Sequence, residues 1–202
     1  MGLIIGLISR AIYHVPAPLT LLQILGIELL VLLYPASVLS RAPSSRHSHL
    51  HFDALLFGMI AACIAYGSFL LTFVWHGISP VSIDTAHQLF QQATTVALVG
   101  LGLCQLTNLL LVRSSNRGLL TIGLWHNRQL VRALAVAGFL LLNVSYNPVF
   151  QAVFGTAALQ PVDWLTIAIG LSLYMGFRRL QHHTHRHSRH VVLELHREIQ
   201  ES

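Results

Sequence analysis

The chain has 202 residues, of which 54% are hydrophobic and only 9% charged, whereas a water-soluble domain carries about 25% charged residues on its surface. Its formal net charge of +5 comes from arginines that lie between apolar runs and form no basic stripe, so nucleic-acid binding is excluded together with an ordinary soluble fold. Much of the surface is therefore expected to face the lipid bilayer.

Six apolar runs follow one another along the chain. The first, Gly2–Val15, would reach only about 21 Å as a helix, so we expect it to be a short or incomplete membrane helix. The other five are long enough, or nearly so, to cross a hydrocarbon core of about 30 Å, which takes about 20 helical residues. They are Leu19–Leu39, Phe52–Trp75, Ala93–Val112, Leu130–Phe150 and about Val162–Leu180.

Runs this long and continuously apolar are typical of helices rather than of barrel strands. The predicted fold is therefore an all-α integral membrane protein, a bundle of about six transmembrane helices over residues 1–180 with no soluble domain. Residues 181–202 form a tail rich in histidine and arginine.

Prolines mark the connections between the runs. Pro18 stands between the first and second runs, and Pro43 between the second and third. Pro148, directly after Asn147, ends the fifth run, and Pro161 precedes the last. Proline lacks a backbone N–H and cannot continue a helix, so we expect each helix to begin or end at these positions.

The arginines predict how the bundle is oriented. Eleven of the twelve fall on one side if successive runs alternate in direction: Arg41, Arg46, Arg113, Arg117, Arg128, Arg132, Arg178, Arg179, Arg186, Arg189 and Arg197. The opposite connections, residues 77–92 and 151–163, hold no arginine but contain Asp84 and Asp163. The positive-inside rule places the arginine side and the C-terminus in the cytoplasm of a multi-pass protein of the plasma or cytoplasmic membrane.

Two pairs of alanines have the spacing of close helix contacts. Ala61 with Ala65, and Ala133 with Ala137, are each four residues apart, as in the small-xxx-small pattern that lets membrane helices approach closely. The alternative interpretation is that alanine is common in apolar runs, so that this spacing occurs without a helix contact.

Four motifs stand in a fixed order along the chain. They are P-A-P-L-T-L-L-Q-I-L at 16–25 with P-A at 35–36, Q-L-T-N at 105–108 continuing to R-S at 113–114, N-P at 147–148, and F-G-T-A-A-L-Q-P-V-D-W-L at 154–165. In order and spacing they resemble the C-terminal membrane domain of calcium-type and related P-type cation-transporting ATPases. The resemblance covers about residues 2–180 and implies that the runs are the end of the fifth helix and helices six to ten of such a pump.

The catalytic half of such a pump is absent from these 202 residues. The chain has no D-K-T-G-T phosphorylation motif and no nucleotide-binding domain, so nothing in it would hold ATP and magnesium. We expect no enzyme activity from this chain alone. The first functional hypothesis is an isolated C-terminal transport domain that contributes to cation transport only with a separate or missing part, such as the catalytic subunit of a P-type ATPase.

The resemblance also implies where cation ligands would stand. It places Glu28 at the sixth-helix asparagine and Gln105 at the eighth-helix ligand. Val31, Leu32 and Leu3 fall where the family has threonine, aspartate and the fifth-helix glutamate, so the ion site is expected to be degenerate.

The candidate cation pathway consists of Glu28, Gln105 and Asn108. An ionisable residue such as Glu28 near a helix centre indicates an ion or proton pathway, or else a protonated carboxyl that is hydrogen-bonded to a neighbouring helix. For Gln105, Asn108 and also Asn143, hydrogen bonds between helices are the structural alternative.

Nine of the thirteen histidines lie in two groups on the predicted cytoplasmic side. The groups are His47, His49 and His51 with Asp53, and His182, His183, His185, His187, His190 and His196. Neutral imidazole is a common ligand of transition metals, so these residues could hold a divalent metal cation, the one cofactor that the sequence suggests. For the second group, the alternative to metal binding is a solvated, partly cationic tail that lies against anionic lipid.

These histidines support a second functional hypothesis. The chain would then be a stand-alone, non-enzymatic membrane protein for the passage or buffering of metal ions. A third hypothesis is a purely structural or lipid-surface protein without ion flux or partner.

Overall fold

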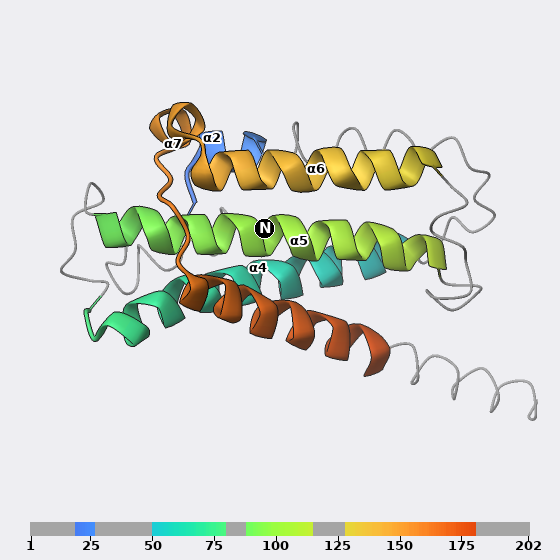
Figure 1. The fold of residues 1–202 in the computed structure, drawn as a ribbon. Coiled ribbons are helices and arrows are strands. Elements are labelled where there is room, and N and C mark those ends of the chain that lie inside the picture. Colours follow the sequence, from blue (N-terminus) through green and yellow to red (C-terminus); the bar gives the residue numbers. More distant parts are fainter. Residues whose placement is uncertain (1–18, 27–49, 80–87, 115–127, 181–202) are drawn as a thin grey trace, which may run out of the picture.

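Figure 1 shows the computed structural model of the chain, in which residues 19–26, 50–79, 88–114 and 128–180 are described. Within these ranges the secondary structure is helical and contains no strand, which confirms the predicted all-α class. The predicted short first helix, most of the second run and the tail lie outside the described ranges.

In the described ranges, four long helices form the bundle and two short ones lie at one end of it. The helices are α2 (Leu21–Gly26), α4 (Leu50–His76), α5 (Gln88–Ser114), α6 (Arg128–Tyr146), α7 (Pro148–Phe154) and the helix of residues 161–180. The four long helices alternate in direction along the bundle (Figure 1). The predicted runs Phe52–Trp75 and Ala93–Val112 lie within α4 and α5.

Helix α5 is the centre of the bundle. It lies between α6 on one side and α4 with the helix of residues 161–180 on the other (Figure 1). In the apolar 18-residue stretch of its span Gln88–Asn108, 83% of the residues are buried inside the protein, against 44% in the apolar 18-residue stretch of the span Leu56–His76 of α4. The position suits its sequence, because α5 carries glutamines and threonines that lipid cannot hydrogen-bond but neighbouring helices can.

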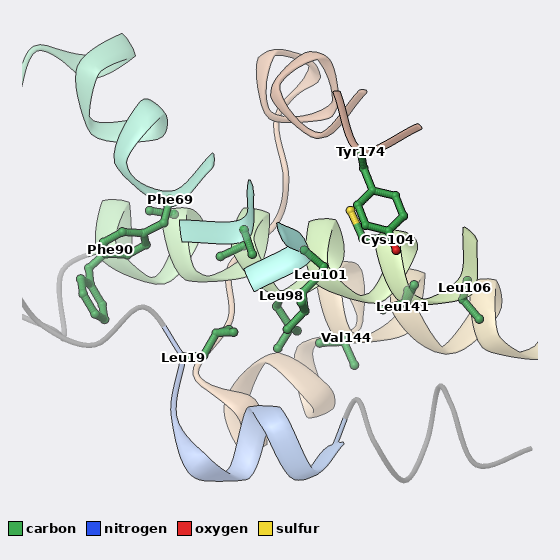
Figure 2. Packing of buried hydrophobic residues seen from close by; sticks show 14 of the residues in the cluster. Leu19, Phe69, Phe90, Leu98, Leu101, Cys104, Leu106, Leu141, Val144 and Tyr174 are labelled. Carbon is green, nitrogen blue, oxygen red and sulfur yellow. The ribbon is translucent and has the colours of Figure 1, made fainter. Parts of the chain in front are cut away.

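Small and aromatic side chains build the contacts around α5. Phe69 of α4 and Phe90 of α5 meet edge to face with ring centroids 5.7 Å apart, and Tyr174 lies beside Cys104 (Figure 2). A Cβ atom on Gly102 would lie 2.9 Å from the side chain of Leu141, so glycine permits the close approach of α5 and α6.

The alanine pairs that the sequence singled out are buried. Ala61, Ala65, Ala133 and Ala137 are all at most 3% exposed. Small side chains at these positions let the helix backbones approach closely.

Two of the described helices, over Leu56–His76 and Gln88–Asn108, are long and apolar enough to cross a membrane. A third span results if α6 and α7 are counted together as one bent unit. The predicted run of about 162–180 does form a helix, but it is not among these spans, because Asp163 and two arginines at its ends make it more polar.

The predicted run Leu130–Phe150 is not one straight helix. It ends at Tyr146, and α7 leaves at an angle of 80°. Asn147 caps α7, since its Oδ1 accepts a hydrogen bond of 3.0 Å from the backbone N–H of Val149, and Pro148 occupies the first helical position. Gly155, with φ 61° and ψ 39°, ends α7 in the left-handed conformation that favours glycine.

Candidate functional site

The candidate site lies on α5 and consists of Gln105 and Asn108. The two residues are three positions apart, so they lie on the same face of the helix about one turn from each other. Both side chains are half-buried, and their carbonyl oxygens, Oε1 of Gln105 and Oδ1 of Asn108, are fully buried. Neither oxygen accepts a hydrogen bond from any group that the structure describes.

Two buried acceptors without donors are an uncommon arrangement. A buried polar group without its partner costs about 1–3 kcal/mol, so proteins leave few of them. Carbonyl oxygens are also the ligands that hard cations take in place of hydration water. The arrangement can therefore supply two neutral oxygens to a cation, which is fewer than the six to eight that a complete calcium site has.

Polar side chains near the start of α5 differ from Gln105 and Asn108, because the described groups there are hydrogen-bonded. Oδ2 of Asp163 accepts hydrogen bonds of 2.7 Å from Nε2 of Gln92 and of 2.7 Å from the backbone N–H of Gln160. The hydroxyl of Thr95 accepts a bond of 2.9 Å from the backbone N–H of Ala157. These bonds fasten the segment 155–160 to α5, and we assign them a structural role.

The sequence did not identify Gln92 and Thr95. A glutamine and a threonine inside an apolar run are the available signal, but their partners lie 71 and 62 residues further along the chain. Only the folded arrangement connects them.

The described hydrogen bonds of Asn143 are local and do not include the bond between helices that the sequence offered as its structural account. Its Nδ2 donates to the carbonyl of Phe139 in the same helix at 2.9 Å, and its Oδ1 accepts from Nδ2 of Asn147 at 3.3 Å. An amide one turn from a helix end can satisfy itself locally, which removes the need for a partner on another helix.

The remaining predicted site residues lie outside the described part of the chain. This holds for Glu28 and for nearly all of the histidine groups. The backbone of His51 and Asp53 belongs to α4, but the side chains of both residues also lie outside the described part of the structure. Within the described ranges, no three side chains of the metal-binding types come together as a metal site would require.

Residues 16–181 match the model of the family described as cation transporting ATPase, C-terminus. No curated protein matches the chain. The family match confirms the resemblance that the four sequence motifs indicate.

Proposed function

This chain belongs to the family of cation-transporting ATPase C-terminal regions, and we propose from that premise that it lines part of a cation pathway in a P-type pump. The phosphorylating and nucleotide-binding parts would come from outside these 202 residues, which contain neither. In this proposal the chain has no ATPase activity by itself and works with a catalytic partner.

The observation that supports the proposal is the pair of buried, unpartnered oxygens on α5. Gln105 stands at the position that the resemblance assigns to an eighth-helix ligand, and Asn108 lies one turn further on. With Val31 and Leu32 at two other ligand positions, the pathway would be poorer in oxygen than a calcium-type site. Glu28 is the carboxyl that we propose to complete it.

The test combines partner capture with a ligand substitution. The full chain is purified in mild detergent from its own membranes, and the preparation is assayed for an acid-stable phosphoenzyme that forms from labelled ATP in a cation-dependent manner. Gln105→Met keeps the shape of the side chain but removes the oxygen. Gln88→Met, at an exposed position of the same helix, is the matched control.

We expect Gln105→Met to weaken the apparent cation affinity about tenfold or more, because a bond to a charged group contributes roughly 1.5–3 kcal/mol. Gln88→Met should leave it unchanged. If no phosphoenzyme accompanies the chain, or if both variants retain the parental cation dependence, the proposal is wrong.

We further propose that the arginine-bearing end of the bundle faces the cytoplasm. Arg128 at the start of α6 and Arg179 near the end of the last helix are both exposed and lie at the same end of the bundle (Figure 1). The opposite end carries Asp163. A membrane-impermeant maleimide should label Gln160→Cys in intact cells, but Arg179→Cys only after permeabilisation. The reverse pattern would overturn the orientation.

A further inference from the structure

The short helix α7 has an unusual distribution of side chains. All of its exposed residues are apolar: Pro148, Val149, Ala152 and Val153. Val149 is 69% exposed and Val153 is 57% exposed. At 100° per residue these four positions form one continuous arc of the helix, and this arc contains no polar side chain.

The polar residue of α7 points the other way. Gln151 is half-buried, and its Nε2 donates a hydrogen bond of 2.6 Å to the backbone carbonyl of Ser145 in α6. Phe150 and Phe154 share this inner side, where they pack against the hydrophobic core. A helix at a water-facing surface shows the reverse arrangement, with its polar residues outside. The outer arc of α7 is therefore built to face an apolar medium.

The direction of α7 restricts what that medium is. Its seven residues are about 10 Å long, and at 80° to α6 they advance only about 2 Å along the direction of α6. Because α6 runs along the bundle, α7 lies across one end of that bundle (Figure 1). A membrane that α6 crosses would therefore have α7 nearly in its plane. Helix α7 does not continue the span of α6.

An aromatic pair marks the depth of this end. The indole Nε1 of Trp164 donates to the hydroxyl of Tyr146 at 2.9 Å, and that hydroxyl donates to the carbonyl of Leu159 at 3.2 Å. Tyr146 is the last residue of α6 and is 47% exposed. Tryptophan and tyrosine with such polar tips concentrate where hydrocarbon meets headgroups, so α7 begins at interface depth.

We propose that α7 is an in-plane anchor: the arc of Pro148, Val149, Ala152 and Val153 inserts into the lipid interface at the end of the bundle opposite the arginines. Short in-plane helices bind membranes in this way through an apolar face at the boundary between headgroups and acyl chains. The anchor fixes the depth of α6 and of the segment 155–160, which α7 connects.

The experiment measures the surroundings of single spin labels on the full chain in phosphatidylcholine–phosphatidylglycerol liposomes. Val149→Cys and Val153→Cys are labelled in a background with Cys63→Ala and Cys104→Ala. Collision with oxygen, which partitions into lipid, is compared with collision with a water-soluble nickel chelate. Two reference positions bracket the scale: Val74, 72% exposed on the α4 span, and Gln160, exposed in the segment after α7.

We expect the oxygen-to-nickel ratio at positions 149 and 153 to shift away from the Gln160 value and toward the Val74 value. A ratio equal to that at Gln160 would show that the arc faces water and would overturn the proposal. Labels that neither reagent reaches would show that another protein segment covers the arc, which overturns it as well.

A second measurement does not depend on replacing the natural cysteines. Val153→Cys and Gln160→Cys are made in the otherwise unchanged chain and treated with a membrane-impermeant maleimide, and the modified residue is identified by mass spectrometry. Position 160 should react many times faster than position 153. Equal rates would contradict the insertion of α7 into lipid.

Discussion

Two neighbouring threonines of α5 permit a controlled test of how the segment after α7 is held. Thr94 and Thr95 are 2% and 0% exposed. The hydroxyl of Thr94 donates to the carbonyl of Phe90 in its own helix at 2.8 Å. The hydroxyl of Thr95 donates to the carbonyl of Gln91 at 2.7 Å and also accepts a bond of 2.9 Å from the backbone N–H of Ala157.

Replacement of each threonine by valine removes the hydroxyl and nearly preserves the shape. Thr95→Val leaves the buried N–H of Ala157 without an acceptor, which costs about 1–3 kcal/mol of unfolding free energy. Thr94→Val removes only a bond to a carbonyl that keeps its helical partner, so we expect a change of about 0.5 kcal/mol or less. The loss of about 1–3 kcal/mol in Thr95→Val corresponds to roughly 5- to 150-fold in the folding equilibrium constant, against about twofold or less in Thr94→Val.

Equilibrium unfolding of the detergent-solubilised full chain, followed by tryptophan fluorescence, measures both free energies. Hydrogen exchange of the Ala157 amide reports the same bond locally and should accelerate in Thr95→Val but not in Thr94→Val. The reasoning is refuted if the two variants lose equal stability or if the Ala157 amide is protected equally in both.

Two further substitutions test the packing of α5. Gly102→Ala places a Cβ atom 2.9 Å from the side chain of Leu141 and should lower the unfolding free energy by roughly 1 kcal/mol. Gly100→Ala, whose Cβ meets nothing within 4 Å, should raise the unfolding free energy by about 0.5–1 kcal/mol. Equal effects of the two variants in the same unfolding assay would contradict the close approach of α5 and α6. Asp163→Ala removes the acceptor of two hydrogen bonds and should lower the unfolding free energy by about 2–4 kcal/mol. Gln92→Leu should lower it less in the Asp163→Ala background than in the parental chain, because the bond between the two side chains is then already lost. Strict additivity in this double-mutant cycle would show that the two side chains do not interact.

The sequence identified Gln105 and Asn108 as site candidates, but it could not show that their oxygens lack donors among the described residues. Whether a buried oxygen finds a partner depends on which helices surround it, and that is a property of the packed bundle. The same reason applies to Asn143, whose amide bonds to Phe139 and Asn147 close by in the sequence.

The sequence by itself determined the helical class, the approximate limits of α4 and α5, and the break at Pro148. These follow from local chemistry, because a run of apolar side chains dissolves in lipid and a proline interrupts helical hydrogen bonding everywhere except in the first turn of a helix. Tertiary structure alone decided that α5 occupies the centre, that Thr95 holds Ala157 from 62 residues away, and that α7 turns 80° with its valines outward. Lipid does not favour one apolar helix over another, so the arrangement of the helices depends on which surfaces fit and which polar groups find partners.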